Sequence, residues 1–152
     1  KMTSQLQLAH FEKDNKKFME EISLYKNEND LWVLKGDTKN SPGTLALHIA
    51  GNLKHFIGAQ LGKTGYLRER DKEFSDRNIP KESLLKGLKE ALEIVKITLS
   101  KLSDEDLQKD FPISFLEKIR PTIEILFILY GHLNYHLGQV NYHRRLTLNP
   151  SP

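Results

Sequence analysis

The chain has 152 residues, of which 38% are hydrophobic and 28% are charged, and its formal net charge is +3. These values are typical of an ordinary globular protein, and the length predicts a single domain over residues 1–152. The sequence contains no cysteine, which excludes disulfides, thiolate metal ligands and an internal thiol nucleophile.

The distribution of apolar and charged residues further limits the class of protein and its expected partners. No apolar run reaches the roughly 18 residues of a transmembrane helix, and the first residues lack the apolar stretch of a signal peptide. We therefore expect no membrane partner and a cytoplasmic location. Basic and acidic residues are interspersed along the chain, so nucleic acid is not a favoured partner.

Four helices are predicted from apolar side chains at helical spacing, and the first covers residues 3–26. Its apolar stripe consists of Leu8, Phe11, Phe18, Ile22 and Tyr25. His10 lies off this stripe and is interpreted as a surface residue. Residues 27–40 are predicted as a loop.

The second predicted helix covers residues 41–62. Ser41 is a favourable N-cap, and Pro42 suits the first helical position. The inward side of this helix includes His48, and Asn52 lies about one turn further along the same side. Asn52 either orients a bound ligand or forms a buried amide that bridges two helices.

Residues 62–80 form a long polar connection, which can span roughly 60 Å when extended. That length allows the second and third helices to run parallel, whereas a short loop would force them to run antiparallel. We interpret its many charged side chains as a solvated, salt-bridged surface. The alternative is that an acidic or arginine side chain of this connection reaches the site. His55, just before the connection, is interpreted as partly exposed.

The third predicted helix covers residues 80–102, and its apolar residues alternate in spacings of three and four, as in a coiled-coil seam. The seam consists of Leu85, Leu88, Leu92, Val95, Leu99 and Leu102. It contains no histidine or inward acid, so we expect it to contribute packing. Residues 103–120 are predicted as a short helical turn followed by irregular chain.

The fourth predicted helix covers residues 121–146, and its core-facing side changes from aliphatic to polar along its length. His132, His136, Gln139 and His143 all lie within an arc of about 60° on that side. His132 and His136 have the i, i+4 spacing that lets two imidazoles reach one metal ion. The alternative is that each is a core histidine bonded to a carbonyl or a tyrosine. His143 lies roughly 16 Å from His132 along the axis, so we expect it at the rim or surface.

His48 supplies a third inward imidazole from a different helix. Three neutral nitrogen donors leave an open coordination position, which is typical of catalytic rather than structural metal sites. Zinc, nickel, copper and ferrous iron all accept such ligands, so the identity of the metal stays open.

The segments LALHIAGNLKHF (residues 45–56) and GHLNYHLGQVNYHRR (residues 131–145) together resemble the DinB-like metal-binding helical-bundle superfamily. That superfamily includes bacillithiol S-transferases and is related to mycothiol-dependent maleylpyruvate isomerases. The charged RERDKEFSDR (residues 68–77) is similar to an uncharacterised subgroup of it. The resemblance implies an all-α fold, namely an up-down-down-up four-helix bundle with a long crossover between helices 2 and 3.

The resemblance also implies that His48, His132 and His136 bind a divalent metal, most commonly zinc or nickel, in a homodimer. The function we expect is a metal-dependent thiol S-transferase acting on a small-molecule substrate. The thiol would come from a low-molecular-weight cofactor such as bacillithiol, because the chain has no cysteine. Asn52, Tyr135 and Gln139 are the candidates for positioning the substrate or the ligands. The alternatives are a metal-dependent hydrolase and a non-enzymatic, stress-associated metal-binding protein.

Overall fold

The computed structural model describes residues 2–148, and all regular secondary structure within them is helical. The prediction of an all-α protein is therefore confirmed for this part of the chain. Two isolated bridges between loop residues are the nearest approach to β-structure there. The α-helices are α1 (Met2–Ser23), α2 (Pro42–Leu53), α3 (Arg70–Ser75), α4 (Lys81–Ser100), α5 (Asp104–Gln108) and α6 (Thr122–Leu148).

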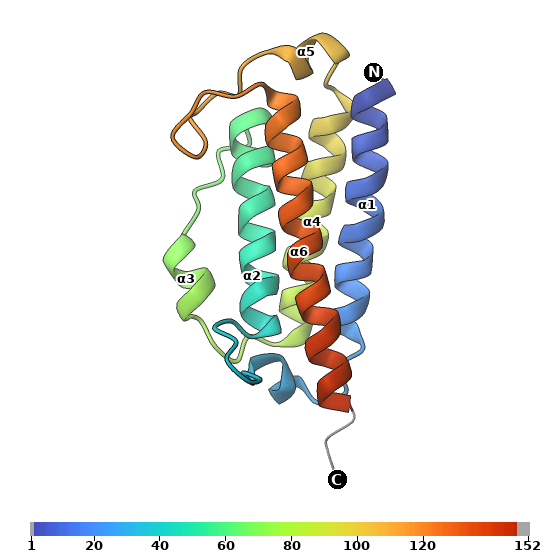
Figure 1. Cartoon of the computed structure of the whole chain (residues 1–152), viewed down its shortest axis with the longest axis vertical. Coiled ribbons are helices and arrows are strands. Elements are labelled where there is room, and N and C mark those ends of the chain that lie inside the picture. The colour runs from blue at the N-terminus through green and yellow to red at the C-terminus, as the bar shows by residue number, and fades with distance from the viewer. Residues whose placement is uncertain (1, 149–152) are drawn as a thin grey trace.

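The four long helices lie side by side (Figure 1), with α1 and α2 each packed against both α4 and α6. In the view of Figure 1, α1 and α6 run downwards, whereas α2 and α4 run upwards. The connection between α2 and α4 therefore crosses back over the length of the molecule. Part of this connection forms α3, which packs along the outside of α2.

The second helix is longer than α2 alone, because a π-helix, η2 (Lys54–Leu61), continues it without a break. The amide of Gly62 bonds the carbonyl of Ile57 at 2.9 Å, which is the wider hydrogen-bond spacing of a π-helix. At the other end, the side chain of Ser41 accepts a bond from the amide of Thr44, as expected of an N-cap.

Two short helices lie in segments where the sequence predicts none. The 3₁₀ helix η1 (Glu28–Trp32) occupies the loop after α1, and α3 occupies the middle of the polar connection. Helices of five and six residues are too short for apolar periodicity to indicate them. The short turn expected after the third helix is present as α5, and a capping box between Ser103 and Asp106 begins it.

The core lies between the four long helices and is mainly aliphatic, with aromatic side chains from α1. From α4 it receives Leu88, Val95 and Leu99, together with Leu84, while the expected Leu85 is partly buried and packs against this core. Leu129, Leu133 and Val140 fill it from α6. Buried apolar side chains from all four long helices form one cluster. Within residues 2–148, none of the helices has the length and apolar content needed to cross a membrane.

Candidate metal centre

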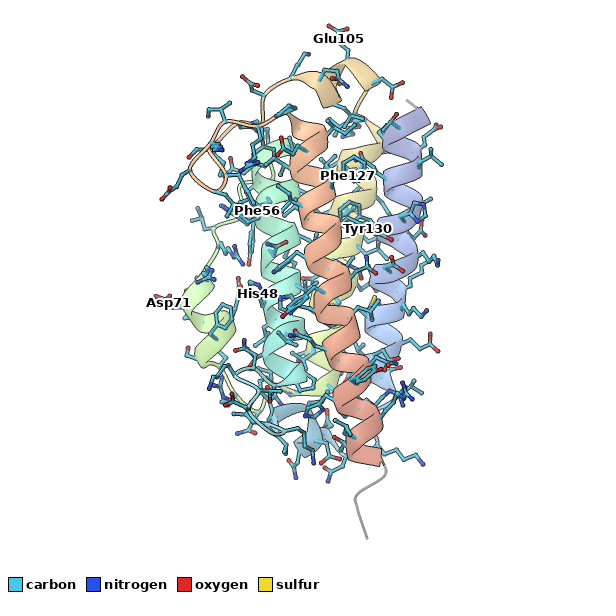
Figure 2. The ribbon with its side chains drawn as sticks, viewed as in Figure 1. His48, Phe56, Asp71, Glu105, Phe127 and Tyr130 are labelled. Atoms are coloured by element: carbon cyan, nitrogen blue, oxygen red, sulfur yellow. The ribbon has the colours of Figure 1, made fainter. Side chains whose placement is uncertain are left out.

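Three imidazole rings meet between α2 and α6. The Nε2 atom of His132 lies 3.0 Å from Nε2 of His48 and 3.1 Å from Nε2 of His136. One nitrogen from each ring lies within 4.8 Å of the other two, so the group could hold a metal ion. Figure 2 shows His48 on α2, at the level of α3. The structure therefore brings together the three histidines that the sequence singles out.

The two helices present these rings from the edge of the core. On α2, His48 directly precedes Ile49, which is fully buried, and His48 itself is only 7% exposed. On α6, His132 and His136 lie on successive turns and are half-buried, while the neighbouring Leu133 is fully buried. The cluster consequently lies where the apolar interior meets the surface, which gives a bound ligand a route to solvent.

The outer nitrogens of two rings have acceptor partners. Nδ1 of His48 lies 3.1 Å from Oε1 of Glu73, and Nδ1 of His136 lies 2.7 Å from Oε1 of Gln139. A carboxylate and an amide oxygen only accept hydrogen bonds, and the Glu73 oxygen lies closer to Nδ1 of His48 than the Arg68 nitrogen does, at 3.4 Å, so we assign the proton of both rings to Nδ1. In this tautomer their Nε2 lone pairs point into the cluster.

This arrangement fits a cation. The Nε2 atom of His132 can donate to only one of its two neighbours, so at least one Nε2–Nε2 contact has no proton between the nitrogens. A divalent ion at the centre satisfies all three lone pairs at once. The outer bonds to Glu73 and Gln139 are the kind that orient metal-binding imidazoles.

The electrostatic surroundings keep the rings of His132 and His136 in the neutral form that binds metals. Burial lowers the pKa of His132 to about 4, and the neighbouring His136 and His48 add to this shift. Burial also lowers the pKa of His136, and the hydrogen bond that His136 donates to Gln139 opposes the change without reversing it.

The carboxylate of Glu73 is held by Arg68 as well as by His48. The guanidinium of Arg68 reaches both carboxylate oxygens, with Nε at 2.8 Å and its terminal nitrogen at 2.9 Å. Burial alone raises the pKa of the Glu73 carboxyl, but the bonds from His48 and Arg68 outweigh it and hold this pKa below its usual value. Glu73 is therefore ionised at neutral pH.

Glu73 and Arg68 are the residues of this site that sequence reasoning did not single out. The 62–80 connection was interpreted as a solvated surface, which is wrong for these two side chains, whose exposed fractions are only 8% and 10%. The alternative, that an acidic or arginine side chain of the connection reaches the site, describes them correctly. One sequence signal pointed there: Gly51 lies in a helix interior three residues after His48, where close approach of another segment is a usual reason for glycine.

The three candidates for positioning residues lie in different surroundings. Gln139 bonds His136, and the exposed ring of Tyr135 packs against the same imidazole with centroids 5.3 Å apart. Asn52 is buried, with 6% of its surface exposed. Of the remaining histidines, His10 is exposed and His55 is half-buried, in keeping with their interpretation as surface and partly exposed residues.

The prediction for His143 is wrong. This residue was expected at the rim or surface, but it is only 8% exposed and bonds both Tyr25 and Val33. The chain that follows α1 folds over this end of α6 and covers the ring. His143 thus takes the role of a core histidine bonded to a tyrosine and a carbonyl.

A cavity of about 620 Å³ adjoins the cluster. Its walls are formed by residues 35–40, by Pro42 and Leu45 at the start of α2, and by the second half of α6. Tyr135, His136 and Gln139 all contribute to the α6 wall, so the cavity reaches one imidazole of the cluster directly. Asn52 lies outside this lining.

Comparison with known proteins identifies a family for the chain but no function. No curated protein matches the chain. A family model described as "Protein of unknown function (DUF1572)" matches residues 3–149. The chain therefore belongs to DUF1572, a DinB-like family whose function is unknown.

Proposed function

We propose that His48, His132 and His136 bind one divalent metal ion and that the protein is a metal-dependent thiol S-transferase. The observation that carries the metal site is the meeting of the three Nε2 atoms, two of them belonging to rings whose protons are held on Nδ1. Zinc and nickel are the metals we expect, because they are the metals commonly associated with the DinB-like superfamily that the sequence resembles.

His48, His132 and His136 would hold the ion and leave it an open coordination position, where it would lower the pKa of a thiol enough for deprotonation near neutral pH. In the proposed reaction, the sulfur of a small-molecule thiol forms a bond to an electrophilic carbon of the substrate. The thiol proton passes to solvent, and the leaving group departs with its bonding electrons. The chain has no cysteine, so the thiol comes from a separate molecule such as bacillithiol.

The cavity beside His136 is the proposed binding place of the small molecules. Its volume of about 620 Å³ falls within the range of small-molecule pockets. Tyr135 offers an aromatic ring at its wall, and Gln139 holds the tautomer of His136. Asn52 is buried outside the cavity lining, and its Oδ1 atom has no hydrogen-bond partner among the described residues, so its role as a positioning residue stays a prediction.

The same proposal extends to the whole molecule. The order and directions of the four long helices support a single-domain, up-down-down-up four-helix bundle of the DinB-like type. Exposed apolar side chains away from this cavity, such as Leu6, Ile97 and Phe127, support a homodimer. We also propose a cytoplasmic location.

The test combines metal analysis with turnover. Purified protein should contain close to one zinc or nickel per chain, and it should consume a low-molecular-weight thiol in the presence of a model electrophile. Stripping the metal should stop this consumption, and adding metal back should restore it. A protein that gains thermal stability from the metal but consumes no thiol would instead be a non-enzymatic metal-binding protein. Hydrolysis of a model ester without thiol consumption would favour the hydrolase.

A further inference from the structure

We propose that Glu73 is a positioning residue for the His48 ligand. We also propose that the lack of a side chain at Gly51 leaves the space on α2 that the Glu73 carboxylate occupies. The inference rests on the proposed metal site and adds to it a role for the charged connection between α2 and α4. In this proposal, the Glu73 carboxylate joins the connection to the metal centre.

The contact between Glu73 and His48 involves the ring nitrogen that a positioning role requires. Oε1 of Glu73 meets Nδ1 of His48, the nitrogen on the far side of the ring from the cluster, at 3.1 Å. An acceptor at this nitrogen holds the proton on Nδ1 and leaves the Nε2 lone pair aimed at His132 and His136. The ring of Phe74, the next residue of α3, packs against the His48 ring with centroids 4.9 Å apart. His48 is thus held both at one edge and on one face by the connection.

Arg68 fixes the carboxylate in turn. Its two bonds to Glu73, at 2.8 and 2.9 Å, form the forked pair that orients a carboxylate in its plane. Both side chains are almost fully covered, and both come from the connection, five residues apart. The connection therefore places the Arg68–Glu73 ion pair against α2.

Gly51 leaves room for the Glu73 carboxylate beside α2. A Cβ atom at position 51 would lie 2.0 Å from Oε2 of Glu73 and 2.6 Å from its carboxyl carbon. Contacts this short force the carboxylate to move, so any residue with a side chain at position 51 displaces Glu73 from His48. Gly87 on α4 is the matched comparison, because a Cβ there would meet nothing closer than 3.9 Å.

Metal binding and the order of the connection are consequently linked. If the connection holds His48 in its metal-binding orientation, then bound metal stabilises the connection to the same extent. Without the Glu73 carboxylate, the connection should no longer orient His48, and bound metal should no longer stabilise the connection.

The experiment measures Zn²⁺ affinity by competition with a chromophoric chelator. Glu73→Ala should bind Zn²⁺ about 10- to 100-fold more weakly than the unmodified chain, the usual effect of removing an outer partner of a histidine ligand. Glu73→Gln should fall between the two, because its amide oxygen still accepts from Nδ1. Gly51→Ala should weaken binding as Glu73→Ala does, although alanine favours a helix over glycine. Gly87→Ala shares that propensity gain and should leave the affinity unchanged.

A double-mutant cycle separates positioning from a general loss of structure. Once Glu73 is alanine, Gly51→Ala has no carboxylate to displace and should cause no further loss of affinity. The visible absorption spectrum of Co²⁺, used as a stand-in metal, should change in Gly51→Ala and in Glu73→Ala but not in Gly87→Ala. In the unmodified chain, Zn²⁺ should slow tryptic cleavage within the connection, and in Glu73→Ala it should not.

The outcomes distinguish this inference from the metal site itself. If the unmodified chain binds no Zn²⁺ or Co²⁺, both are overturned. If it binds the metal, but Glu73→Gln and Gly51→Ala match its affinity and spectrum, only the positioning role is overturned. Additive losses in the double variant would also overturn it, because they would show that Gly51 acts independently of Glu73.

Discussion

The hydroxyl of Tyr25 lies 2.8 Å from Nδ1 of His143, so the chain just after α1 is joined to the last part of α6 inside the core. The other nitrogen of the same ring lies 2.7 Å from the carbonyl oxygen of Val33 and donates its proton there. Nδ1 is consequently the acceptor of the tyrosine proton. Burial lowers the pKa of His143, and the bond to Val33 opposes this only in part, so the ring is held neutral.

The first prediction concerns the pH dependence of stability. The folded-state pKa of His143 lies below the value of 6.5 for an exposed histidine, so in that range the unfolded chain binds more protons. The stabilisation from neutral His143 is complete above about pH 6.5 and is lost progressively as the pH falls towards the folded-state pKa. Urea denaturation at a series of pH values should show this decline.

The variant His143→Gln removes the titrating group and keeps a donor for Val33. It should be less stable at pH 7.5, by about 1–3 kcal/mol for an impaired buried hydrogen-bond pair, and its stability should decline less steeply below pH 6.5. Equal slopes for the two proteins would mean that His143 does not contribute to the acid sensitivity.

His143 also shows what helical spacing can and cannot predict. Spacing placed its ring on the core-facing side of α6 and correctly separated it from the pair at 132 and 136. It could not predict what covers that end of the helix, because Val33 approaches from 110 residues away in the sequence. A loop that folds back over a helix end leaves no periodic signal in the helix.

The residues of the candidate site also differ in whether local spacing in the sequence can predict them. The i, i+4 spacing on α6 and the inward position of His48 on α2 are local properties, so the sequence was sufficient to group these three residues. Glu73 reaches His48 from a six-residue helix across 25 positions of the chain. Its charge-rich surroundings are what a solvated loop also has, and only the crossing of the connection over α2 brings its carboxylate to the ring.

The second prediction concerns the proposed ligands. His132→Ala should abolish stoichiometric metal binding, because the Nε2 atom of His132 lies between those of the other two rings. Helix content should stay largely unchanged, since apolar packing between the long helices carries the fold. Elemental analysis and circular dichroism measure the two effects. His10→Ala, which alters an exposed histidine, is the control and should retain the metal. Full metal content in His132→Ala would refute the ligand assignment.

The third prediction concerns stabilisation by the metal. A ligand that binds only the folded state raises the free energy of unfolding by about 2.7 kcal/mol at a concentration of 100 times its Kd. Added Zn²⁺ should therefore raise the Tm of the unmodified chain in a concentration-dependent way, and a chelator should reverse the increase. His132→Ala should show no such increase. A similar increase in both proteins would place the stabilising Zn²⁺ elsewhere.

The last prediction concerns Gln139, which holds His136 as Glu73 holds His48. Its Oε1 atom accepts from Nδ1 of His136 at 2.7 Å, so Gln139→Leu removes the acceptor and should weaken metal binding about 10-fold or more. Gln139→Glu keeps an acceptor at that position and adds a negative charge that favours a cation nearby, so its affinity should equal or exceed that of the unmodified chain. The control is Asn134→Ala, which removes an amide that bonds the carbonyl of Tyr130 on the same helix. If Gln139→Leu and Asn134→Ala bind the metal equally well, the hydrogen bond to His136 does not tune the site.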